Sequence, residues 1–171
     1  MRRIPFAWAI LGLALACATG SVEDRVRSAS LAGDRDAAFA VLENALEGAD
    51  PRSDLPRRIA LLDRMARMNE HEERFAEAEP LYEESLKLSL LEYGEADPNT
   101  ADRINNIGAL VHKRGRYAEA DGHYRRALAI YDAALEPDSL RATTTMANLG
   151  MLDRLMQRDA EAVDLVTRTL T

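Results

Sequence analysis

The strongest constraint on the fold is an internal repeat with a period of 42 residues. Residues 74–78 read Arg-Phe-Ala-Glu-Ala, and close variants recur at residues 116–120 and 158–162, without an insertion or deletion. The same register aligns apolar and small residues upstream: Leu62, Ile104 and Met146; Met65, Ile107 and Leu149; Ala66, Gly108 and Gly150. A fixed period of this length indicates a solenoid, in which each copy buries its apolar face against the next copy.

Each copy is predicted to contain two helices. In the second copy, Ile104, Ile107 and Val111 lie at helical spacing, and Ala120 and Tyr124 resume that spacing after a turn. The composition agrees, because 47% of the residues are hydrophobic but only 5% are aromatic. Ala, Leu, Arg and Glu dominate, and these residues favour helices over strands.

Turn and capping residues predict where the helices begin and end. Asp54 precedes Pro56 and can cap a helix, Gly94 can end one, and Asn99 or Thr100 can start the next. We therefore expect repeats at 54–98, 99–138 and 139–171, the last without a capping helix, after a degenerate helix pair and link at 19–53.

The second copy resembles a tetratricopeptide repeat of the kinesin-light-chain type. The resemblance rests on residues 105–108 (Asn-Asn-Ile-Gly), 115–120 and 127–131, and it covers about residues 55–171. It implies an all-α fold, a short right-handed α-solenoid of antiparallel helix pairs whose first helices line a concave face. Asn69 and Asp153 depart from the pattern, because they stand where Val111 is apolar.

The concave face is the expected binding site. In tetratricopeptide proteins this face usually recognises protein segments, and Asn at the position of Asn106 and Asn148 commonly contacts bound peptide. An Asn side chain both donates and accepts, so it can pair with a peptide backbone of any sequence. The neighbouring cations also predict an extended segment of acidic character. The candidate peptide-binding residues are Asn105, Asn106, Asn148, Arg64, Arg67, His112, Lys113 and Arg154.

Several functions are disfavoured by what the sequence lacks. The 22 Lys and Arg against 29 Asp and Glu give a net charge of −7, which opposes nucleic-acid binding. The three His form no zinc-binding spacing, one Cys cannot make an internal disulfide, and neither a phosphate-binding loop nor a Gly-x-Ser-x-Gly turn is present. We expect no enzyme, no metal and no cofactor.

Residues 1–18 have the layout of a secretory signal peptide. Arg2 and Arg3 precede an apolar run, and small residues follow around Cys17. The stretch ending in Cys17 resembles a bacterial lipobox, which would make this cysteine the lipid-bearing first residue of the mature chain. Cleavage after Ala18 is the alternative. We expect an outer-membrane lipoprotein facing the periplasm or exterior, or else a periplasmic or secreted protein.

Two functions remain open at this stage. The first is a non-catalytic, envelope-tethered scaffold that holds a protein or peptide segment in the concave groove of its repeats. The second is a structural subunit of an envelope complex, assembled through its convex face or its uncapped C-terminal edge. Val163, Leu165, Val166 and Leu170 cannot all point inward in one helix, so apolar surface is expected at that edge. Either another chain covers it, as a heterologous partner or by self-association, or the third copy frays.

Overall fold

A computed structural model describes residues 20–134, 139–156 and 167–169. Every regular element in these ranges is an α-helix, as the composition and periodicity predict. The chain divides into two compact units, residues 1–50 and 51–171, which we describe separately. Residues 1–19, which include Cys17, and most of the segment after α8 lie outside the described residues.

The first unit is one helix pair. Helix α2 spans Val22–Leu31 and helix α3 spans Arg35–Glu47. Ser21 and Asp34 cap the two helices, because their side chains accept hydrogen bonds from the backbone N–H groups of Asp24 and Ala37. Gly33, at φ +71°, makes the turn between them.

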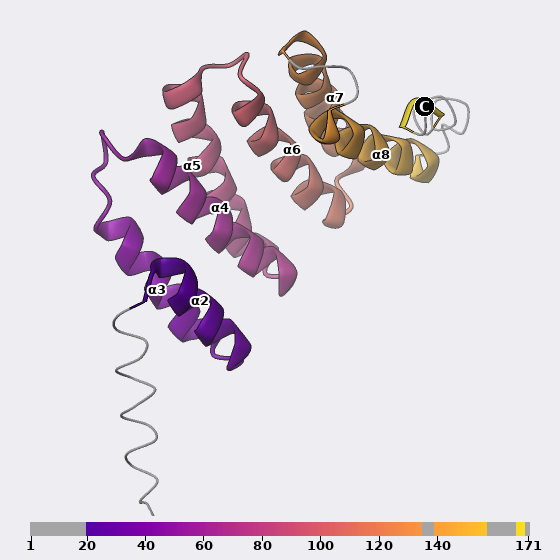
Figure 1. Cartoon of the computed structure of the whole chain (residues 1–171). Coiled ribbons are helices and arrows are strands. Elements are labelled where there is room, and N and C mark those ends of the chain that lie inside the picture. Colours follow the sequence, from indigo (N-terminus) through magenta and orange to yellow (C-terminus); the bar gives the residue numbers. More distant parts are fainter. Residues whose placement is uncertain (1–19, 135–138, 157–166, 170–171) are drawn as a thin grey trace, which may run out of the picture. The chain divides into compact units, whose positions relative to one another are not determined.

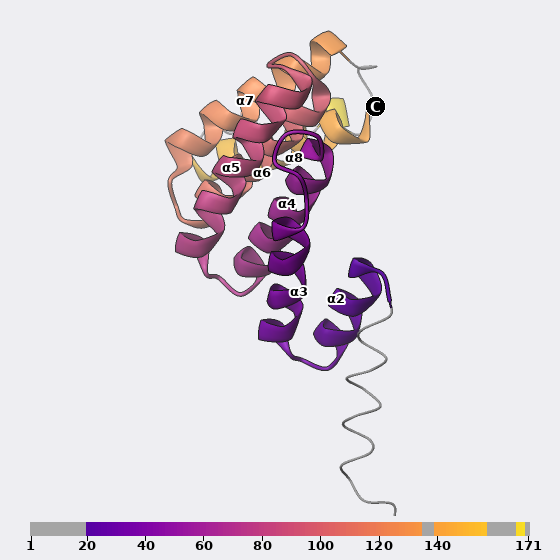
Figure 2. The same cartoon turned by 90° about the vertical axis from the view of Figure 1, so that its left-hand side faces the viewer.

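The second unit consists of helices that pack in sequence order. Its elements are α4 (Leu55–His71), α5 (Phe75–Tyr93), α6 (Pro98–Lys113), α7 (Tyr117–Ala134) and α8 (Leu140–Leu155). Each helix packs against the next, and the first helices α6 and α8 also touch each other. Figures 1 and 2 show this succession of helix pairs from two sides. The arrangement is the predicted α-solenoid.

Helix α6 begins earlier than the sequence suggested. It starts at Pro98 because Asp97 is the cap, and the Asp97 carboxylate accepts from the N–H of Asn99 at 2.7 Å. Thr100 is buried, and its hydroxyl donates to the carbonyl of Gly94 at 2.7 Å. Thr100 therefore ties the turn to the core and does not start the helix.

The core follows the 42-residue register. Ile104, Ile107 and Gly108 are buried, as are their counterparts in the neighbouring copies. Tyr82 and Tyr124 of the second helices α5 and α7 are buried too. Asn69 and Asp153 are also buried, at the position of the apolar Val111. The guanidinium of Arg125 lies 3.7 Å from the Asp153 carboxylate. Both departures from the repeat pattern therefore lie in the core, and Asp153 has a cation nearby.

Candidate binding groove

A buried carboxylate joins the first helices α4 and α6. Asp63 on α4 is only 3% exposed. It accepts a hydrogen bond from the Ser85 hydroxyl at 2.5 Å and pairs with Arg103 of α6 at 2.8 Å. Charge-assisted contacts of this kind fix the side chains that make them. Asp63 and Arg103 thus form a buried ion pair at the bottom of the groove between α4 and α6.

The next pair of first helices repeats this contact. Thr145 of α8 donates its hydroxyl to the side-chain oxygen of Asn105 on α6 at 3.0 Å. Asn105 lies 42 residues after Asp63, and Thr145 lies 42 residues after Arg103. A polar contact between successive first helices therefore recurs with the period of the sequence, even though its chemistry changes from an ion pair to a neutral hydrogen bond.

A polar hollow of about 250 Å³ lies beside these contacts, between α4 and α6. We call it the amide hollow, and its lining residues are Asp63, Arg67, Asp102, Arg103, Asn105 and Asn106. The side chains of Arg67 and Asn106 form no hydrogen bond or ion pair with another described residue. The NH₂ group of Asn105 is not used by Thr145, which donates to the oxygen. The amide hollow thus offers donors of three side chains.

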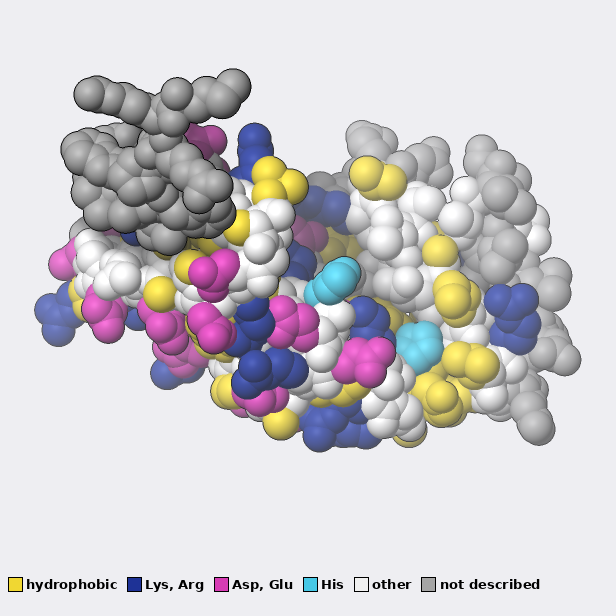
Figure 3. Space-filling view, turned by 90° about the horizontal axis from the view of Figure 1, so that it is seen from below, with side chains coloured by type: hydrophobic (Ala, Val, Ile, Leu, Met, Phe, Trp, Pro, Cys, Tyr) yellow, Lys and Arg dark blue, Asp and Glu magenta, His cyan; other side chains and the backbone are white. Residues whose placement is uncertain are grey.

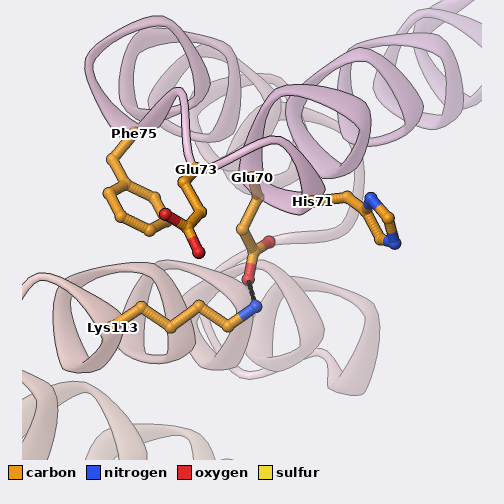
Figure 4. Close-up of a pocket in the computed structure, with 5 residues that line it drawn as sticks. All are labelled: Glu70, His71, Glu73, Phe75 and Lys113. Atoms are coloured by element: carbon orange, nitrogen blue, oxygen red, sulfur yellow. Dashed lines mark ion pairs between the residues drawn. The ribbon is translucent and has the colours of Figure 1, made fainter.

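A second hollow, of about 470 Å³, lies at the carboxyl-terminal ends of α4 and α6. We call it the glutamate hollow, and its lining residues are Glu70, His71, Glu73, Phe75 and Lys113. Figure 4 shows Glu70 and Glu73 directing their carboxylates toward α6, with the Phe75 ring beside Glu73 and His71 pointing away. The ammonium of Lys113 lies 2.9 Å from Glu70.

Glu70 is held from two sides. Besides pairing with Lys113, its second carboxylate oxygen accepts the hydroxyl proton of Tyr82 at 2.6 Å. Burial, and then the hydrogen bond to Glu70, raise the pKa of Tyr82 far above its usual range, so the phenol remains a donor. Both oxygens of the Glu70 carboxylate are therefore used within the chain, and its negative charge balances the charge of Lys113.

The predicted site residues do not all lie in one place. Arg67, Asn105 and Asn106 meet in the amide hollow, and Lys113 lies in the glutamate hollow. Asn148 is half-buried and Arg154 is exposed on α8, at positions that follow Asn106 and His112 by 42 residues. Arg64 is half-buried and is already engaged in an interaction within the chain.

His112 is turned against the tyrosines of α7. Its ring makes edge contacts with Tyr117 and Tyr124, and its Nδ1 lies 3.5 Å from the Tyr124 hydroxyl. Burial lowers the pKa of His112. The side chain therefore helps to pack the helix pair, which the sequence pattern alone did not indicate.

The polarity of the first helices changes along the array. Met151 and Leu155 on α8 are 51% and 57% exposed, and they occupy the positions of Arg67 and His71 on α4. In Figure 3, basic and acidic side chains lie intermixed, and charged side chains become fewer toward the α8 side. No large area of one sign is visible on this face.

Sequence reasoning missed most of the polar network beneath the groove. Asp102 accepts a hydrogen bond from the Tyr131 hydroxyl at 2.8 Å, and Arg141 of α8 approaches it to 3.5 Å. No similar residue lies 42 positions from Asp102 or from Arg141, so the repeat pattern could not predict these contacts. The Asp63–Arg103 pair could have been found, because both residues share the register positions of Asn105 and Thr145.

The described ranges contain no group of three or more His, Cys, Asp or Glu side chains arranged to hold a metal ion. Within the same ranges, no helix combines the length and apolar character needed to cross a membrane.

Comparison with known proteins places these features in a family. The chain resembles BtubC (BKLC) from P. vanneervenii with a TM-score of 0.79 and 22% identity, over 87% of this chain and 59% of that one. It resembles a Podosopora anserina protein described as a kinesin light chain with nearly identical TPR-like repeats, with a TM-score of 0.71 and 19% identity, over 86% and 71% of the two chains.

The apo form of RapI is also similar, with a TM-score of 0.74 and 16% identity, over 95% of this chain and 60% of that one. The chain thus spans about 60% of the length of BtubC and of RapI. No curated protein matches it. A tetratricopeptide repeat model matches residues 57–133 and 101–171, so the chain belongs to the tetratricopeptide repeat family.

Proposed function

We propose that this protein is a non-catalytic scaffold that holds an extended protein segment in the groove formed by α4, α6 and α8. Membership of the tetratricopeptide repeat family supports a protein-binding role. The observation that carries the groove assignment is the amide hollow. The side chains of Arg67 and Asn106 line this open polar space and form no hydrogen bond or ion pair with another described residue.

The recognition chemistry follows from the amides. Asn106 can donate to a backbone carbonyl and accept from a backbone N–H, so a strand-like segment satisfies both groups whatever its side chains are. Asn148 would offer the same pair of groups one repeat further along. Because Lys113 is compensated by Glu70, Arg67 is the groove cation best placed to meet an acceptor.

We also propose that Cys17 tethers the domain to the cell envelope. The support is the sequence pattern around Cys17, with a cationic start and an apolar run before it. A tethered domain would present its groove to segments of other envelope proteins. Secretion after cleavage at Ala18 is the competing fate.

A structural-subunit role has one observation in its favour. Leu90 and Leu91 on the second helix α5 are 38% and 73% exposed, which leaves apolar surface on the side of the array away from the first helices. The C-terminal edge, where self-association was expected, lies outside the described residues.

Site-specific photocrosslinking separates these functions. A photoreactive residue at position 109, which follows Arg67 by 42 residues in the groove, should capture a partner in whole cells. The same residue at position 91 on α5 reports contacts of the other side. We expect Asn106→Ala with Asn148→Ala to abolish capture from position 109. Capture from position 91 alone, unaffected by the Asn variants, would support the structural subunit and refute the groove.

A further inference from the structure

The glutamate hollow carries one negative charge that the described residues do not balance. Glu70 is neutralised by Lys113 at 2.9 Å and hydrogen-bonded by Tyr82 at 2.6 Å. Glu73 lines the same space and is exposed, and its carboxylate forms no hydrogen bond or ion pair with another described residue. His71 points away from the other four side chains (Figure 4). The net charge of the lining is therefore that of Glu73.

The chain already places a cationic group in this hollow. Lys113 reaches from α6 to the Glu70 carboxylate on α4, so an ammonium group fits against one of the two acids. Beside the second acid lies the ring of Phe75 (Figure 4), and an aromatic face attracts a cation. A carboxylate next to an aromatic ring, in a space of about 470 Å³, suits the end of a basic side chain.

Glu73 is also an unusual residue for its backbone. Its φ is +58°, and it is the one described non-glycine residue with a positive φ. The equivalent turns in the neighbouring copies use Gly33 at φ +71° and Gly115 at φ +75°. A side chain in this conformation is strained by roughly 1 kcal/mol relative to glycine. Glycine would make this turn more stable, so the presence of a glutamate at position 73 is not explained by the stability of the turn.

We propose that the glutamate hollow is a subsite for a lysine or arginine side chain of the bound protein segment, with Glu73 as its ion-pair partner and Phe75 as its packing surface. This inference rests on the groove function proposed above and adds the chemistry of the partner. The segment carries a basic side chain at this end of the groove, while its backbone meets the amides of Asn105 and Asn106. It is therefore not uniformly acidic, as the cations of the sequence had suggested.

The test uses small probes whose binding does not require the partner. Chemical shifts of the Glu73 and Phe75 amides are followed while N-acetyl-arginine methylamide is added to the purified full chain, with the uncharged citrulline analogue in parallel. We expect saturable shifts with arginine and none with citrulline. Glu73→Gln should weaken arginine binding about fivefold, because an exposed ion pair and a cation–ring contact are each weak.

Two further variants exclude indirect effects. Glu73→Gly removes the carboxylate but adopts the backbone conformation without strain. It should weaken arginine binding as much as Glu73→Gln does, while the domain remains at least as stable. Glu83→Gln removes one exposed carboxylate from α5, outside the hollow, and should bind arginine normally. Equal binding of citrulline, or unchanged arginine affinity in both Glu73 variants, would refute the subsite.

The outcome is separable from that of the proposed function. Continued crosslinking from position 109 with no arginine binding would remove the cationic subsite and leave the groove. Arginine binding without any capture from position 109 would leave the subsite and contradict the groove function. Where a partner is captured, the crosslinked peptide should contain Lys or Arg, and its recovery should fall in Glu73→Gln.

Discussion

At the scale of single residues, Gly108 shows how closely two helices of one repeat approach. A Cβ added at Gly108 would lie 3.0 Å from the ring of Tyr124 and 3.1 Å from the Cβ of His123. Tyr124 is 1% exposed, so its ring has little freedom to move. The small residue that the 42-residue register places here is therefore required by contact with α7.

A pair of glycine variants tests this contact. Gly108→Ala should lower the free energy of unfolding by about 1 kcal/mol, because overpacking against Tyr124 outweighs the gain in helix propensity. Gly122→Ala, also inside a helix but with nothing within 4 Å of the added Cβ, should raise it by about 1 kcal/mol. Urea unfolding measures both. Equal changes of the same sign would contradict the packing described.

The buried ion pair beneath the groove makes a second residue-scale prediction. Arg103→Met should lower the free energy of unfolding by about 3 kcal/mol, because it leaves the Asp63 carboxylate buried without its cation. Arg126→Met breaks an exposed pair with Glu95 of the same 2.8 Å length, and it should change stability by less than about 1 kcal/mol. Comparable losses in the two variants would show that burial does not decide the outcome.

At the scale of helices, two histidines make the stability of the α6–α7 pair depend on pH. Burial lowers the pKa of His112, and burial together with Arg126 and Arg116 lowers that of His123 against the opposing effect of Glu119. As the pH falls below 6.5, the ordinary pKa of histidine, these side chains bind protons in the unfolded chain but remain neutral in the folded chain. The folded state therefore loses stability as the pH falls through this range.

This dependence can be measured between about pH 7 and pH 5.5, where carboxylates titrate little. The free energy of unfolding should fall across this interval, and His112→Gln with His123→Gln should flatten the fall. His71→Gln is the matched control, because His71 is exposed at the end of α4. A slope that persists in the double variant, or disappears in the control, would assign the effect to other groups.

The helices themselves could be predicted because their signals are local and repeated. Helical spacing, turn glycines and the 42-residue register identified the helix pairs and the core positions of Ile104 and Gly108. The start of α6 was misplaced because Asp97 and Thr100 are both plausible caps, and only tertiary contacts show that the Thr100 hydroxyl is used by the turn before the helix. Element ends depend on such competition.

At the scale of the whole molecule, the candidate site was less predictable than the fold. The 42-residue register was sufficient to predict that Arg67, Asn105 and Asn106 lie on one surface, and all three line the amide hollow. It could not show that Lys113 is compensated, because its partner Glu70 comes from the preceding repeat and has no acidic equivalent at His112. Side-chain pairing between repeats depends on residues that differ from copy to copy, so the charge available to a partner emerges only from the assembled array.

The last prediction concerns the anchoring of the whole chain. If Cys17 bears a lipid, the mature protein sediments with membranes, and Cys17→Ser shifts it to the soluble fraction. Removal of residues 1–16 also removes Trp8, the only tryptophan, and changes the net charge from −7 to −9, because Arg2 and Arg3 are lost without any acid. The mature chain should therefore show tyrosine fluorescence only. Intact mass distinguishes the fates: an acylated chain beginning at Cys17 supports the tether, whereas an unmodified soluble chain beginning at Thr19 means plain secretion.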